Sequence, residues 1–372
     1  MVQIATIAES MPGSLKLCYG ESDLPTPAFI CRAAHDAALA GHTFYTHTAG
    51  YTELRQAIAD KVFELHRVRY APAGIMATVG ATMAIYAAIR ALVGPGDNAI
   101  VISPAYAIFT NGVIMAGGEP RPVPLAPHGD RFQLDLDRVR AAIDANTRLL
   151  IVNSPSNPTG WMITEEEQHA LIEIADRHDL VILADEVYER LVYDSDAVAP
   201  SFARVETNRD RLIVVNSFSK TYNMTGWRLG WAQTSPRTIK TMYRAVEFMT
   251  SNPTAMVQQA GIVALRDGEP SIRELREHYA HRREQVMRAL KAIPGVTLPT
   301  PQGAFYAFPK IDAASDSTAF TAALVRETGV ALAPGVGFGS DGEGYIRVCF
   351  ASTEATLTSA LSRLRNFVMN AR

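Results

Sequence analysis

The chain has 372 residues, of which 48% are hydrophobic and 20% are charged, as in an ordinary globular protein with a sizeable core. Its net charge of −3 provides no attraction to nucleic acid or to an anionic membrane, and no apolar run reaches the roughly 20 residues that span a bilayer. Three separated cysteines argue against a disulfide framework and, because residues 1–14 lack the features of a signal peptide, we expect a cytoplasmic location.

Apolar runs of strand length alternate with amphipathic patterns typical of helices. Buried strands are predicted at residues 98–102, 149–152, 181–184 and 212–215. A helix is predicted over 164–179, with Thr164 and Glu167 at the positions of a capping box. Alternating strands and helices favour an α/β fold, in which helices cover both faces of a mostly parallel sheet.

The last quarter of the chain has a different pattern. A charged helical stretch over residues 270–293 is predicted to lead out of the sheet domain. Residues 303–308 and 345–350 then alternate like strands, which indicates a smaller α+β domain. We therefore predict a large domain over residues 30–280 and a small domain formed by residues 1–29 and 281–372.

Polar residues come directly after several of the predicted strands. They are the loop 153–160, Asp185, Ser217, Ser219 and Lys220. Ligands of open parallel sheets bind outside the carboxyl ends of the strands. We therefore expect these residues, although distant in sequence, to meet at one edge of the sheet.

Residues 217–230 read SFSKTYNMTGWRLG and place Lys220 among hydroxyl groups, with Arg228 eight residues further on. A lysine that forms an imine with an aldehyde cofactor needs a pKa lowered by burial or by a cationic neighbour. A phosphate on that cofactor needs hydroxyl and guanidinium partners. The stretch meets every fixed position of S-x-S-K-x-x-x-x-x-G-x-R-x-G. It resembles the pyridoxal-phosphate lysine segment of class I and II aminotransferases, which have fold type I.

Two further segments resemble the same family. Residues 153–160, NSPSNPTG, are similar to its N-x-P-x-N-P-T-G loop. The resemblance implies that the Asn157 amide and the Tyr188 hydroxyl contact the phenolic oxygen of the cofactor. It also implies that the Asp185 carboxylate faces the pyridine nitrogen and keeps it protonated. The alternative is a purely structural role, in which Asp185 is the N-cap of a helix.

The start of a predicted helix at residues 79–86 is the third such segment, because backbone amides at a helix N-terminus entered through glycine form an anion site. The resemblance assigns the cofactor phosphate to Gly80, Ala81, Thr82, Ser217, Ser219 and Arg228. It implies that Tyr106 stacks on the ring, the alternative being a core tyrosine. It also implies that Tyr45 reaches the phosphate of a neighbouring subunit, and hence a homodimer with shared active sites.

Three residues are candidates for substrate binding. Arg347 lies in a strand-like run, and the family uses an arginine there to hold the substrate α-carboxylate through a bidentate fork. The alternative is a surface arginine on an edge strand. Gly20 resembles the glycine loop that closes over the substrate, and Asn157 resembles a residue that helps to hold the carboxylate.

The resemblance implies an aminotransferase that moves an amino group between an L-amino acid and a 2-oxo acid by a ping-pong mechanism. Lys220 would act as acid and base, aided by Asp185 and Tyr188. Because fold and cofactor do not determine the reaction, the alternatives are β-elimination of the C–S lyase type and a specialised amino-acid biosynthetic enzyme. No metal site is predicted, since His278 and His281 lack a third ligand at metal spacing.

The expected substrate class follows from Thr82. Some aspartate-selective members of the family carry a lysine at this place, which meets the side-chain carboxylate of the substrate. Together with Tyr19 and Tyr106, Thr82 favours neutral or aromatic amino acids as donors. The open alternative is an arginine from a second subunit that replaces the lysine.

Overall fold

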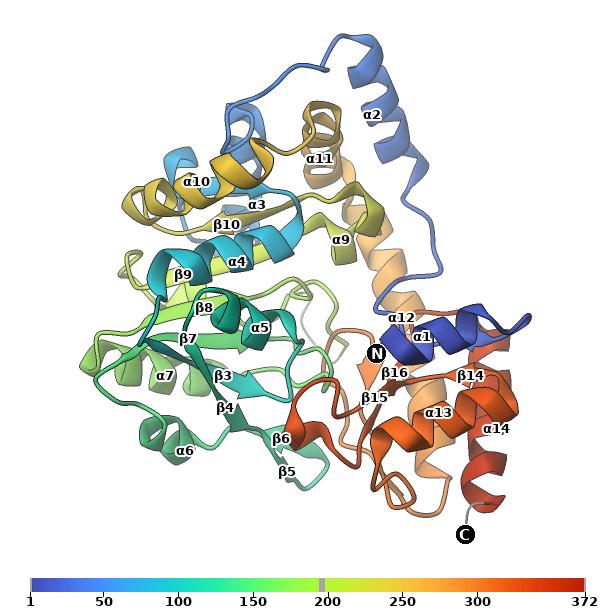
Figure 1. Ribbon diagram of the computed structural model, residues 1–372. Coiled ribbons are helices and arrows are strands. Elements are labelled where there is room, and N and C mark those ends of the chain that lie inside the picture. The colour runs from blue at the N-terminus through green and yellow to red at the C-terminus, as the bar shows by residue number, and fades with distance from the viewer. Residues whose placement is uncertain (1, 194–197, 371–372) are drawn as a thin grey trace.

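The computed structural model describes residues 2–193 and 198–370. A seven-stranded sheet lies at its centre, with the spatial order β2-β10-β9-β8-β7-β3-β4 (Figure 1). Its strands are β2 (Ile75–Thr78), β3 (Asn98–Ser103), β4 (Glu119–Pro124), β7 (Thr147–Asn153), β8 (Val181–Asp185), β9 (Leu212–Ser217) and β10 (Gly230–Gln233). Only β10 is antiparallel to its neighbours, so the prediction of a mostly parallel sheet is confirmed.

The inner strands are largely apolar because helices cover both faces of the sheet. In β8, Ile182 and Ala184 belong to one core cluster, and Leu183 belongs to the cluster on the opposite face. Successive side chains of a strand point to opposite faces, which explains this alternation between clusters. The sequence pattern therefore predicted β3, β7, β8 and β9 well, because each is buried on both sides.

The covering helices divide between the two faces. One face packs against α4 (Gly80–Leu92), α5 (Ile108–Met115) and α10 (Pro236–Thr250). The other packs against α2 (Ala28–Leu39), α3 (Thr52–His66), α7 (Glu165–Arg177), α8 (Phe202–Val205) and α11 (Ala255–Asp267). The short helices α6 (Leu136–Ala141) and α9 (Phe218–Thr221) lie in the connections of this region.

The capping box predicted at the start of α7 is present. The Thr164 hydroxyl accepts from the backbone N–H of Glu167 at 3.2 Å, and the Glu167 carboxylate accepts from the N–H of Thr164 at 2.9 Å. The helix is slightly shorter than predicted. It ends at Arg177, because Asp179 turns into the left-handed region with φ of 57°.

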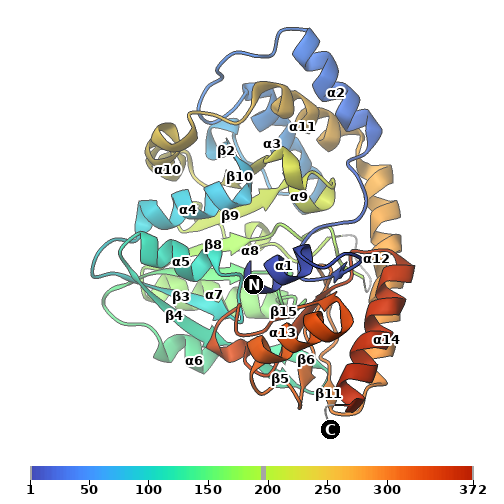
Figure 2. The ribbon, with the colours of Figure 1, turned by 45° about the vertical axis from the view of Figure 1, so that its right-hand side comes forward.

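A second core forms where the chain leaves the sheet. Helix α12 (Glu269–Lys291) runs beside α14 (Glu354–Asn370), and α14 also packs against α13 (Ser317–Thr328) (Figure 2). Three pairings join the short strands: β11 (Val296–Thr297) with β13 (Lys310–Ile311), β12 (Tyr306–Ala307) with β16 (Ile346–Cys349), and β15 (Ala333–Pro334) with β16. A small hairpin of β5 (Ala126–His128) and β6 (Arg131–Gln133) follows β4.

The N-terminal residues join this second core. Helix α1 (Val2–Glu9) packs against α13, and β1 (Leu15–Lys16) pairs in parallel with β14 (Val330–Ala331). This contact agrees with grouping the two ends of the chain together. The domain boundaries at residues 30 and 280 stay a prediction, and α12 continues without a break through residue 280.

The alternating strand predicted at residues 303–308 is wrong in extent. Only Tyr306 and Ala307 are in a strand, and all six residues are buried. Ala304 has a φ of 58°, so the backbone turns there instead of extending. The three cysteines are free thiols, of which Cys18 and Cys349 are buried. Within the described residues, no helix combines the length and apolarity needed to cross a membrane.

Candidate active site

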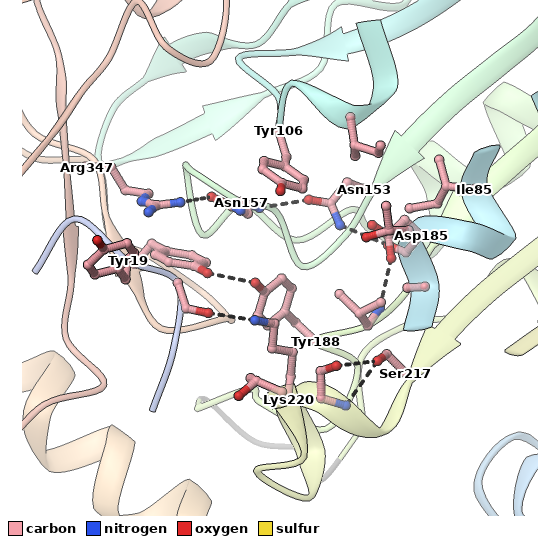
Figure 3. Close-up of a pocket in the computed structure, with 18 of the residues that line it drawn as sticks. Tyr19, Ile85, Tyr106, Asn153, Asn157, Asp185, Tyr188, Ser217, Lys220 and Arg347 are labelled. Atoms are coloured by element: carbon pink, nitrogen blue, oxygen red, sulfur yellow. Dashed lines mark hydrogen bonds between the residues drawn. The ribbon is translucent and has the colours of Figure 1, made fainter. Parts of the chain in front are cut away.

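A cavity of about 600 Å³ opens at the carboxyl ends of β7, β8 and β9. Asn153, Asp185 and Ser217 are the last residues of these strands, and all three line the cavity (Figure 3). Of the residues predicted from sequence, the cavity brings together Gly20, Ala81, Thr82, Tyr106, Asn157, Asp185, Tyr188, Ser217, Ser219, Lys220, Arg228 and Arg347. The expected meeting at one sheet edge is therefore observed.

Two predicted residues do not line the cavity. Gly80 lies against the guanidinium of Arg228. Tyr45 is 90% exposed and lies outside the cavity of its own chain. Its exposure leaves the ring available to another molecule.

Lys220 extends from α9 into the cavity. Its Nζ donates a hydrogen bond to the carbonyl of Gly20 at 2.6 Å, which ties α9 to the N-terminal segment. The rings of Tyr188 and Phe305 lie 5.9 and 5.6 Å from the Nζ. Burial lowers the pKa of Lys220 to about 8. About a tenth of this amine is therefore neutral, and nucleophilic, at pH 7.

Asp185 is a buried carboxyl group at the end of β8. One oxygen accepts from the backbone N–H of Val187 at 3.3 Å, and Asp185 forms no ion pair with a described residue. Burial raises the pKa of Asp185 to about 7. Asn153 beside it donates to the Asp185 backbone carbonyl at 3.1 Å. The Asp185 carboxyl group is thus a buried acceptor suited to a cationic donor inside the cavity.

The end of the neighbouring strand, β9, offers donors to an anion. Ser217 caps α9 by accepting from the N–H of Ser219 at 3.0 Å, and Arg228 contacts the Ser219 hydroxyl at 3.5 Å. Gly80 has a φ of 76°, and a Cβ there would collide with the Arg228 guanidinium. Glycine thus lets the arginine pack directly on the first turn of α4, whose N-terminal amides carry a partial positive charge.

Arg347 and Asn157 meet on a third side of the cavity. The Arg347 guanidinium donates to Asn157 Oδ1 at 2.8 Å and to the carbonyl of Cys18 at 2.5 Å. The ring of Tyr306 stacks over it at 4.5 Å. With 3% of its surface exposed, Arg347 is not the surface arginine of the alternative interpretation. Its charge faces the cavity, where a carboxylate can bind it.

Sequence reasoning missed Tyr306 and helix α1. The Tyr306 hydroxyl lies 2.8 Å from that of Tyr188, and burial together with this neighbour raises the pKa of Tyr188. Helix α1 lines the cavity through three residues, Ala5, Thr6 and Glu9. No motif marks either feature, because both reach the cavity only through the packing of the second core.

The sequence pattern of the family described as aminotransferase class I and II matches residues 12–364. The chain belongs to this family. An aspartate aminotransferase of Pyrococcus abyssi is 35% identical over 362 residues, covering 96% of this chain and 92% of the relative. The aromatic-amino-acid aminotransferase 2 of Thermococcus litoralis is 34% identical, with the same coverage.

The solved structures agree. An aromatic aminotransferase from Pyrococcus horikoshii superposes with a TM-score of 0.92 at 33% identity, covering 99% of both chains. The predicted fold class and enzyme class, an aminotransferase of fold type I, are thereby confirmed. None of these aminotransferases is named for the alternative reaction, β-elimination.

Proposed function

We propose that this aminotransferase binds pyridoxal 5′-phosphate and moves an amino group between an L-amino acid and a 2-oxo acid. One observation supports this best. The amine of Lys220, with its lowered pKa, and the buried carboxyl group of Asp185 line the same cavity, which also offers donors to an anion. An aldehyde, a basic ring nitrogen and a phosphate on one small molecule would satisfy all three groups.

The residues present fit this cofactor. Asp185 would pair with the ring nitrogen, and Lys220 would hold the aldehyde carbon covalently. Asn157 and Tyr188 would donate to the ring oxygen, and Tyr106 would cover the ring face. The phosphate would bind to Gly80, Ala81, Thr82, Ser217, Ser219 and Arg228. When bound, pyridoxal phosphate supplies a carbonyl group that captures amines and a ring that accepts electrons.

The remaining steps belong to side chains of this chain. Arg347 and Asn157 would fix the substrate α-carboxylate, with Gly20 closing over it. The freed Lys220 amine would then remove the α-proton and return it as an acid, a role that suits a pKa of about 8. The bond from Lys220 to the Gly20 carbonyl would break when the lysine takes up these roles.

We also propose a homodimer with shared active sites. Tyr45 is 90% exposed and the neighbouring Phe44 is 80% exposed. Two large aromatic side chains side by side on a surface are typical of a contact with another chain. In a symmetric pair, Tyr45 of each subunit would reach the phosphate in the other subunit. The predicted cytoplasmic location is retained as part of this proposal.

The test is a half-reaction without an acceptor. Purified protein with pyridoxal phosphate is mixed with single amino acids, while the visible absorption is recorded and released 2-oxo acid is measured. We expect bleaching with an equal amount of 2-oxo acid, and neither signal from Lys220→Ala. Asp185→Asn should bind cofactor but react about 100-fold more slowly, because the ring nitrogen loses its anionic partner. Persistent absorption with release of pyruvate and ammonia would instead establish β-elimination.

A further inference from the structure

The N-terminal segment forms the part of the cavity next to Arg347, where the substrate α-carboxylate is proposed to bind. Tyr19 directly follows Cys18, whose carbonyl accepts from Arg347, and the Tyr19 ring lies near Arg347 (Figure 3). Ala5, Thr6 and Glu9 of α1 line the same cavity. If Arg347 holds the α-carboxylate, as the proposed function requires, Tyr19 and α1 lie within reach of the substrate side chain.

The charged side chains that line this cavity differ in whether they are free to interact with a substrate side chain. Its basic lining residues, among those the structure describes, are Lys220, Arg228 and Arg347. Each of the three already has a part in the proposed function. Its acidic lining residues are Asp185, buried at the end of β8, and Glu9 on α1. A second carboxylate on a substrate would therefore meet Glu9 and no uncommitted basic side chain of the described residues.

A hydrogen bond holds Glu9 in this position. The Tyr19 hydroxyl donates to Glu9 Oε1 at 2.8 Å, and this bond raises the pKa of Tyr19 to about 12. Glu9 is the last residue of α1, where the helix dipole disfavours a carboxylate. The negative charge of Glu9 therefore does not stabilise α1. Its hydrogen bond with Tyr19 instead holds the Glu9 carboxylate at the cavity, where it would repel a second carboxylate on a substrate over several ångströms.

We propose that Glu9, oriented by Tyr19, is a specificity-determining residue that disfavours amino acids with a side-chain carboxylate. The donors are then neutral or aromatic amino acids, whose side chains the ring of Tyr19 can contact. This inference rests on the proposed function and identifies its substrate class. It sets this chain apart from those relatives that are named aspartate aminotransferases.

The test compares kcat/KM for phenylalanine, leucine, aspartate and glutamate in wild type, Glu9→Gln and Tyr19→Phe. We expect wild type to prefer phenylalanine. Glu9→Gln should raise kcat/KM for aspartate and glutamate about fivefold, mainly through KM, with phenylalanine changed less than twofold. Tyr19→Phe should also raise kcat/KM for aspartate and glutamate, but by a smaller factor than Glu9→Gln does. Because both changes affect one contact, the double variant should match Glu9→Gln alone.

The matched control is Glu327→Gln, which makes the same change of charge on the exposed surface of α13 and should leave all four donors unaffected. Higher salt should narrow the wild-type preference and leave that of Glu9→Gln unchanged, since salt screens exposed charges. The inference would be overturned if wild type used aspartate as efficiently as phenylalanine, or if Glu9→Gln left the ratio of kcat/KM for aspartate to that for phenylalanine unchanged. An arginine from a second subunit that binds the side-chain carboxylate would make wild type efficient with aspartate.

Binding measured without turnover separates this inference from the proposed function. Calorimetry with succinate and with 3-phenylpropanoate compares a dicarboxylate with an aromatic monocarboxylate. Glu9→Gln should bind succinate about fivefold more tightly than wild type does, with 3-phenylpropanoate unchanged. If no amino acid is turned over but this difference is observed, the proposed function fails and the role of Glu9 stands. If turnover occurs and both ligands bind equally to the two proteins, the role of Glu9 fails.

Discussion

Arg347 on β16 and Asn157 in the loop after β7 are joined by a 2.8 Å hydrogen bond, although 190 positions separate them in sequence. The bond connects the second core to the edge of the large sheet, directly at the cavity. It orients the guanidinium and leaves the Arg347 Nε without a partner among the described residues. A substrate carboxylate would complete this set of donors and acceptors.

Replacing Arg347 by lysine tests this arrangement. Lysine keeps the charge but cannot present the planar fork to a carboxylate or bond Asn157 and Cys18 together. We expect kcat/KM for amino acids to fall by about 100-fold, chiefly through a higher KM. Steady-state kinetics at a saturating concentration of the 2-oxo acid acceptor measure kcat and KM. The visible absorption of the cofactor is the control that the variant still binds it. A change confined to kcat would contradict a role in carboxylate binding.

The pKa of Lys220 predicts how the protein captures its cofactor. Because burial lowers that pKa to about 8, the neutral fraction of the amine rises about tenfold between pH 7 and pH 9. The rate of covalent capture of pyridoxal phosphate by the cofactor-free protein should rise by the same factor and level off above pH 9. Stopped-flow absorption measures this rate. A rate that keeps rising up to pH 11 would indicate an unshifted lysine.

Gly80→Ala should weaken the anion end of the cavity. Gly80 has a φ of 76°, and its added Cβ would collide with the Arg228 guanidinium. We expect a loss of about 1 kcal/mol in stability from the backbone alone and a cofactor dissociation constant at least tenfold higher. Equilibrium dialysis and urea unfolding measure the two effects. Gly96→Ala is the control, because Gly96 has a similar φ of 88° with open space around it.

A buried cluster of Glu186, Glu189 and His66, none of which lines the cavity, predicts a pH-dependent stability. Glu186 accepts from the Ser201 hydroxyl at 2.7 Å and from the N–H of Phe202 at 2.9 Å, while His66 bonds Glu189 at 2.8 Å. Burial, reinforced by the charge of Glu189, raises the pKa of Glu186 from 4.5 to about 7. Between these two values the folded state binds more protons than the unfolded state, so stability falls as the pH rises.

Glu186→Gln removes this titration. From pH 5 to pH 8, wild type should lose about 2–3 kcal/mol more of its unfolding free energy than the variant does. Urea unfolding at four pH values measures the difference. Burial lowers the pKa of His66, but its bond to Glu189 and the charges of Glu189 and Glu186 raise it overall, so the titration of His66 is followed separately in both proteins. Parallel pH curves would show that Glu186 is ionised at low pH in the folded protein.

Much of the fold was predictable from local pattern. The strands β3, β7, β8 and β9 are continuous apolar runs, because each is buried on both faces of the sheet. The end of each parallel strand also indicated where polar residues would gather. The sequence was least informative in the second core, where Ala304 turns a run that alternates like a strand.

The sequence by itself determined the family, the sheet and the chemical groups at its edge. These follow from periodicity, caps and motifs, which act over a few residues. Only the tertiary structure decided that Tyr306 and helix α1 complete the cavity. Both reach it through long-range contacts, namely the pairing of β12 with β16 and of β1 with β14. Such contacts depend on which apolar surfaces are buried together, and no short segment carries that information.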